Sequence, residues 1–104
     1  MSDALTTTLP LRRWQGDRGT YHLVQIDGSV AEQITTHAHL QRLEFGTRRG
    51  FGSVKVVARI GDTSWKSSVF PSKPDKWILL VSKKVMRAEG LAEGDPVKLE
   101  LELL

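Results

Sequence analysis

The segment best suited to binding chemistry is Arg48-Arg49-Gly50-Phe51-Gly52-Ser53, which combines two cations, two glycines, an aromatic ring and a hydroxyl. Glycines let backbone N–H groups approach an anion closely, and arginine guanidiniums bind oxyanions through two parallel hydrogen bonds. The ring of Phe51 could stack on a base. The alternative is structural: the glycines bend the chain into a strand, and Phe51 closes one end of a barrel. The pattern lacks the third glycine and the following helix of a dinucleotide fingerprint.

A second polar segment, residues 63–68, places hydroxyl groups on both faces of an expected strand. Lys66 and Ser68 share the outward face, where they suit a polar ligand. The alternative is an edge strand whose hydroxyls are only solvated. From the two segments together we expect a ligand-binding set for an anion, formed by Arg48, Arg49, Gly50, Phe51, Ser53, Lys66 and Ser68.

Residues for catalysis or metal binding are not arranged in any recognisable pattern. His37 and His39 are two positions apart, so on a helix their side chains diverge by about 200° and cannot share a metal ion. The sequence has no cysteine, no P-loop and no nucleophile elbow. We therefore expect no catalytic residue, no metal site and no cofactor.

The composition is typical of a folded soluble domain. A chain of 104 residues fits one domain, and 39% hydrophobic with 26% charged residues argues against disorder. No apolar run approaches the ~20 residues that a membrane helix needs, and the first residues lack the pattern of a secretory signal. We therefore expect a cytoplasmic protein that has no membrane partner.

The positive charge is concentrated in one part of the chain. Residues 42–76 hold eight Lys and Arg against three acids, although the net charge of the whole chain is only +3. A basic segment in a nearly neutral protein indicates an anionic partner. The alternative is a solvated face whose lysines prevent association between sheet edges.

The pattern of apolar residues predicts six strands and two short helices. We expect a flexible tail over residues 1–8 and a single domain over residues 9–104, with a two-residue hairpin turn at Gly61-Asp62 and a helix ending at Gly90. Trp14 and Trp77 are expected to fill the core. The expected strands lie near 9–14, 21–26, 54–60, 63–70, 77–81 and 97–103, and the expected helices span 30–39 and 83–89.

One supersecondary unit occurs twice. Strand–helix–turn–strand units open at Ile26 and Val81, 55 positions apart, and their second strands start at Val54 and Val97, 43 positions apart. Neither unit can bury its own apolar face. The predicted fold is therefore all-β, a closed six-stranded barrel of two pseudo-symmetric halves with short connecting helices. Because one chain carries both halves, a monomer is expected.

Two family resemblances agree with this pattern. Residues 81–85 and 90–97 resemble the swapped-hairpin element of AbrB-like regulators and MazE-type antitoxins, in which two chains each contribute one unit to a barrel. Residues 48–54, 60–68 and 70–71 and the C-terminal block are similar to the family called domain of unknown function 1905. That second resemblance covers roughly residues 9–104 and implies a double-split β-barrel. It implies no established activity.

Three functional hypotheses follow from these observations. The first is a non-enzymatic binding module for an anionic or aromatic small ligand. The second is a nucleic-acid-binding regulator, by analogy with AbrB-like folds. The third is an enzyme or subunit of unknown chemistry. A nucleic-acid site needs a broad basic surface, whereas a small-ligand site needs convergence on one pocket.

Overall fold

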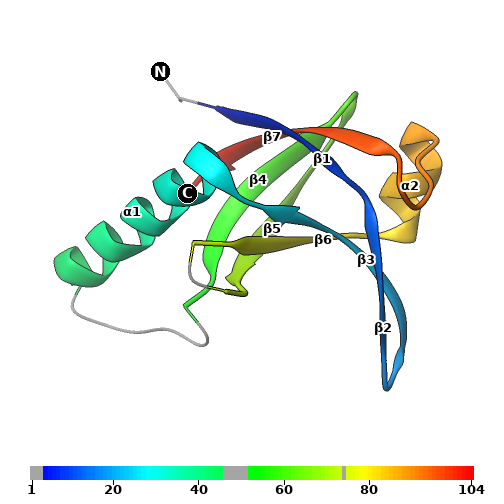
Figure 1. Ribbon diagram of the computed structural model, residues 1–104. Helices are drawn as coiled ribbons and strands as arrows, with labels where there is room; N and C mark the ends of the chain where they lie inside the picture. The colour runs from blue at the N-terminus through cyan, green and yellow to red at the C-terminus, as the bar shows by residue number, and fades with distance from the viewer. Residues whose placement is uncertain (1–3, 46–51, 74) are drawn as a thin grey trace.

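The computed structural model describes residues 4–45, 52–73 and 75–104 as one curled antiparallel sheet with two helices (Figure 1). The sheet has seven strands in the order β1-β7-β4-β5-β6-β3-β2. Figure 1 shows the helices at opposite ends of the sheet. The elements are β1 (Leu5–Pro10), β2 (Arg12–Gly16), β3 (Gly19–Ile26), α1 (Gly28–Phe45), β4 (Val54–Ile60), β5 (Thr63–Pro71), β6 (Trp77–Val81), α2 (Lys83–Glu89) and β7 (Pro96–Leu103).

The two edge strands of the sheet are consecutive in the chain and are joined by a single residue, Leu11. At the end of the β1–β7 ladder Pro10 lies opposite Pro96. The next residue, Leu11, still bonds to this side: its N–H donates to the carbonyl of Asp95 at 2.9 Å, and its carbonyl accepts from the N–H of Gly94 at 2.7 Å. After this switch point the chain pairs with β3.

The expectation of a closed six-stranded barrel is wrong in two respects. The switch at Leu11 divides the expected strand over residues 9–14 between β1 and β2, so there are seven strands. Within the described ranges no ladder joins β1 to β2 or to β3, and the sheet is a curled half-barrel. β1 also begins at Leu5, inside the range 1–8 that was expected to be a flexible tail, because Leu5 and Leu9 turn toward the core while β1 pairs with β7.

The second helix confirms the expected span and the expected C-terminal cap at Gly90. The side chain of Ser82 accepts a hydrogen bond from the N–H of Val85 and caps the helix at its start. Gly90 follows its last residue in the left-handed region, at φ 63°. The N–H of Leu91 reaches back to the carbonyl of Met86 at 2.8 Å, which completes a Schellman motif.

The first helix is longer than expected and packs on one end of the core. It continues past residue 39 to Phe45. Val30 and Ile34, four positions apart, are buried as their helical spacing predicts. A hydrogen bond from Nε1 of Trp77 to Oγ1 of Thr35, at 3.0 Å, ties the helix to β6. Trp77 is thereby confirmed as a core residue, with 5% of its surface exposed.

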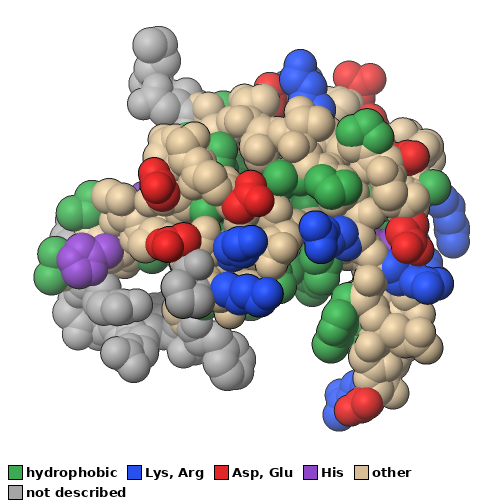
Figure 2. All heavy atoms as spheres, in the orientation of Figure 1, with side chains coloured by type: hydrophobic (Ala, Val, Ile, Leu, Met, Phe, Trp, Pro, Cys, Tyr) green, Lys and Arg blue, Asp and Glu red, His purple; other side chains and the backbone are tan. Residues whose placement is uncertain are grey.

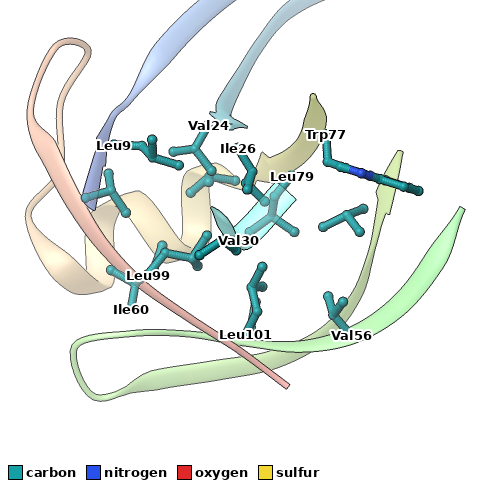
Figure 3. Close-up of a cluster of buried hydrophobic side chains, with 14 of the residues drawn as sticks. Leu9, Val24, Ile26, Val30, Val56, Ile60, Trp77, Leu79, Leu99 and Leu101 are labelled. Atoms are coloured by element: carbon teal, nitrogen blue, oxygen red, sulfur yellow. The ribbon is translucent and has the colours of Figure 1, made fainter. Parts of the chain in front are cut away.

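Side chains from both halves form one core, shown in Figure 3. The inward positions alternate along each strand, so every strand with a buried face contributes residues two apart. The side chains buried most completely are Leu11, Val24, Ile26, Ile34, Val54, Val56, Val69, Leu79, Val97, Leu99 and Leu101.

The strand register has the form that a twofold relation between the halves requires. Under such a relation, a residue on the axis must pair with its own equivalent in the other half. Val24 of β3 pairs with Leu79 of β6, 55 positions later. Ala58 of β4 pairs with Leu101 of β7, 43 positions later. These are the two offsets at which the unit recurs in the sequence, as a twofold relation between the units would require.

Because both halves come from one chain, we expect a monomer in solution. Sedimentation of a dilute sample at moderate salt should give one species near 11.6 kDa. A dimer that unfolds on dilution would contradict this expectation, since it would show that strands are exchanged between chains.

Gly61 gives a stability prediction, because two constraints meet at this residue. It lies in the β4–β5 hairpin turn at φ +59°, and an added Cβ would collide with the carboxylate of Glu89. That carboxylate accepts a hydrogen bond from Oγ1 of Thr63 at 2.6 Å. We expect Gly61→Ala to lower the free energy of unfolding by about 2 kcal/mol, from left-handed strain and the displaced hydrogen bond.

Gly90 provides the matched control for this measurement. It has nearly the same backbone angle, φ +63°, but nothing lies within 4 Å of its added Cβ. Urea unfolding of Gly90→Ala should therefore show only the strain contribution, about 1 kcal/mol. Equal losses in the two variants would show that Glu89 moves aside at no cost.

Candidate binding face

The outer face of the sheet carries a continuous row of apolar side chains. Directly opposed residues of an antiparallel pair lie on the same face. Trp14 pairs with Tyr21, Leu23 with Leu80, and Phe70 with Ile78. Tyr21 and Leu23 are two positions apart on β3, and Ile78 and Leu80 are two positions apart on β6, so all six side chains lie on one face. We call this set the outer apolar row; its members are Trp14, Tyr21, Leu23, Leu80, Ile78 and Phe70.

Four members of the row are exposed: Trp14, Tyr21, Phe70 and Leu80. Trp14, expected in the core, has 56% of its surface exposed. The reason is that the β2–β3 hairpin projects beyond the body of the sheet (Figure 1), so the outer side of β2 has no layer above it. Exposed apolar side chains that form a contiguous row are typical of an interaction surface.

Trp14 is held in a defined position although it is exposed. Its ring lies 5.8 Å from the ring of Tyr21, centroid to centroid, at a tilt of 30°. On its other side it covers Gly16, where an added Cβ would lie only 2.8 Å from the indole. A glycine at this position therefore leaves the space that the indole occupies. An aromatic side chain with little freedom to lose suits an anchor for a ligand.

Cationic and hydroxyl side chains continue the outer face beyond Phe70. Lys66 and Ser68 alternate with inward residues of β5, and Ser68 lies opposite Lys55 of β4. We call Lys55, Lys66 and Ser68 the lysine border. On the far side of the row, Arg12 pairs with Leu23. The outward positions of β2, β3, β5 and β6 carry no carboxylate.

The residues expected to bind an anion are only partly within the described chain. Lys66 and Ser68 lie together on the outer face, as their alternation predicted, and the exposed Ser53 directly precedes β4. The predictions for Arg48, Arg49, Gly50 and Phe51 lie outside the described residues. The described members of the expected site form part of an open face. The exposed aromatic residues of the row were missed, although Tyr21 and Leu23 already alternate outward in the sequence.

A groove of about 620 Å³ lies elsewhere, between α1 and the ends of β1 and β7. Its lining contains two carboxylates, one histidine and no lysine or arginine, so an anion would be repelled there. His37 and Gln41 of α1 contact the carbonyl oxygen of Leu104 near this groove, at 3.1 and 2.9 Å. The lining residues are Leu5, Ser29, Glu32, Gln33, Thr36, His37, Leu40, Glu102 and Leu103.

The charged residues seen in Figure 2 are distributed singly and in small groups among hydrophobic side chains. In the described part of the chain, no three His, Cys, Asp or Glu side chains come together in a way that could hold a metal ion. No helix among these residues is both long and apolar enough to cross a membrane.

The architecture defines a mostly β domain: a curled antiparallel half-barrel built from two strand–helix–strand units. Residues 8–101 match the family model described as domain of unknown function (DUF1905), so the chain belongs to that family. The membership expected from the ordered motifs is thereby confirmed. No curated protein matches this chain in sequence.

The contact between Trp14 and Gly16 can be tested spectroscopically. Gly16→Ala should displace the indole from Tyr21, because the new methyl group takes the space of the ring. We expect a change in the near-ultraviolet circular dichroism of the aromatic pair, with the unfolding midpoint lowered only slightly.

Tyr21→Leu is the companion variant, since it removes the second ring while keeping an apolar side chain. It should cause a spectral change of the same kind. A Gly16→Ala spectrum identical to that of the unmodified protein would show that Trp14 does not rest on Gly16.

Proposed function

We propose that this protein is a non-enzymatic binding module for a small ligand that carries both an anionic group and an aromatic ring, such as a nucleotide. The ligand binds on the outer face, where the lysine border adjoins the outer apolar row. The observation that supports this most directly is that Lys66, Ser68 and Phe70 occupy three successive outward positions of β5.

The anionic group binds at the lysine border. Lys55 lies across the β4–β5 ladder from Ser68, and Lys66 is two residues away along β5. Two ammonium groups and one hydroxyl thus extend from neighbouring positions of the outer face. Charge-assisted hydrogen bonds from lysine are stronger than neutral ones, although exposure to water reduces the gain. Phosphate and carboxylate are the groups that this arrangement recognises.

The aromatic ring of the ligand binds on the adjoining apolar side chains. Phe70 lies opposite Ile78, and Leu80 follows Ile78 at the next outward position of β6. A flat ring covering these side chains removes apolar surface from water on both partners. Since the face is open, affinity depends on the anionic and aromatic groups being joined in one molecule.

A binding role also fits the rest of the face. The outer positions of β5 and β6 offer cations, hydroxyls and apolar side chains, with no paired acid and base for proton transfer. A cytoplasmic location is part of the proposal, because a cysteine-free chain forms no disulfide that an oxidising compartment would favour.

The test is a titration with adenosine monophosphate, adenosine and inorganic phosphate, followed by amide chemical shifts. We expect the nucleotide to bind more tightly than either part, with shifts centred on β5 and β6. Lys66→Gln should weaken binding of the nucleotide about threefold to tenfold, because one charged contact is lost. Binding of adenosine should not change.

Lys98→Gln is the matched control, since Lys98 is an exposed outward lysine on β7 that lies outside the lysine border. It changes the net charge by the same amount as Lys66→Gln and should leave the affinity unchanged. Equal effects of the two variants would show that the affinity depends only on the net charge of the protein and not on Lys66. If adenosine monophosphate causes no change in the amide chemical shifts, the proposal is overturned.

A further inference from the structure

We propose that the outer face binds a single strand of nucleic acid, and that the free nucleotide is only the smallest unit of this ligand. The inference rests on the proposed function and extends it along the whole outer apolar row, from Phe70 on β5 to Trp14 on β2.

The row is too long for one nucleotide. Trp14 and Phe70 lie on strands that are three steps apart in the sheet. Tyr21 is the partner of Trp14, whereas Gln25 is aligned with Ile78 and Phe70, so the two aromatic residues also differ by four residues along the strand direction. With ~4.8 Å between strands and ~3.4 Å per residue, the backbone positions of the two residues are about 20 Å apart along the sheet. A molecule with one base contacts one of these rings, whereas linked nucleotides contact both.

Positive charge is present at both ends of this path. Lys55 and Lys66 flank Phe70 at one end, and Arg12 lies beside Leu23 near the other. Between them the outward positions are apolar or uncharged. Successive phosphates of one strand therefore meet cations while the intervening bases cover apolar side chains. Single-strand binding surfaces combine these two features.

The exposed rings favour a single strand over a duplex. Stacking on Trp14 or Phe70 requires the flat face of a base, which neighbouring base pairs cover in a double helix. Trp14 is held by Tyr21 and Gly16, yet 56% of its surface stays exposed and available to such a base.

The charge pattern also argues against a second copy of this chain as the occupant. A twofold dimer would place the face against itself. The cations Arg12 and Lys66 would then face cations of the other copy, with no carboxylate on the outward positions of β2, β3, β5 and β6 to compensate them. A strand of phosphates supplies the missing negative charge.

The experiment measures fluorescence anisotropy of labelled oligothymidylates from one to about eight nucleotides long, with the full chain at fixed salt. We expect affinity to rise at least tenfold between one and about four nucleotides and then to level off. Oligouridylate shows whether the sugar matters. A duplex of matching length should bind more weakly than the single strand.

Two substitutions, one at each end of the row, distinguish a ligand that contacts both ends from a ligand that contacts only one. Trp14→Ala and Phe70→Ala should each weaken the longer oligonucleotides about fivefold or more. Trp14→Ala should leave the mononucleotide unchanged, since that ligand binds at the Phe70 end. Leu43→Ala is the control, because Leu43 is an exposed apolar residue on α1, away from the row. Thermal unfolding checks that each variant is folded.

Salt dependence provides a second readout. With three cations contacting phosphates, the slope of log affinity against log salt should be about −2, and Lys66→Gln should reduce its magnitude by about 0.7. Equal affinity for all lengths would overturn the single-strand inference while leaving the binding of a nucleotide intact. Failure of nucleotide and oligonucleotides alike would overturn both proposals. Binding to anionic phosphatidylserine vesicles but not to oligonucleotides, or a dimer that Trp14→Ala dissociates, would identify a different occupant.

Discussion

The pairing of the two strand–helix–strand units, β3 with β6 and β4 with β7, is the constraint on which the other features of this protein depend. At Val24–Leu79 and Ala58–Leu101 each half meets its own equivalent, and all four side chains are buried. Each strand–helix–strand unit has one apolar face that it cannot cover alone. Once the units are joined, their inward residues form a single core and their outward residues form a single outer surface.

The first segment of the chain completes this arrangement by forming both edge strands of the sheet, first β1 and then β2. Its pairing with β7 ends at Pro10, and after Leu11 it pairs with β3. This explains why β2 extends past the body of the sheet and why Trp14 remains exposed there. Trp14, at one end of the outer apolar row, is thus exposed because it lies on an edge strand that projects from the sheet.

The two candidate ligand surfaces differ in charge, and the difference separates their roles. The groove beside α1 is bounded by Glu32 and Glu102, whereas the outer face between β5 and β2 carries Lys66 and Arg12 without a carboxylate. This difference in charge is why we propose the outer face, rather than the groove, as the site of an anionic ligand.

Local patterns in the chain were enough to predict the features that depend on neighbouring residues: the span and C-terminal cap of α2, the hairpin turn at Gly61, the alternation of β7 and the recurrence of one unit. Periodicity and backbone angles are properties of short segments, and they persist in the folded state. Long-range contacts set the rest. The exposure of Trp14 depends on where its hairpin projects. The division of the first strand depends on its change of partner, from β7 before Leu11 to β3 after it, and the open half-barrel depends on which edges pair. The outer apolar row exists only once β2, β3, β6 and β5 lie side by side, because its six residues come from four separate segments of the chain.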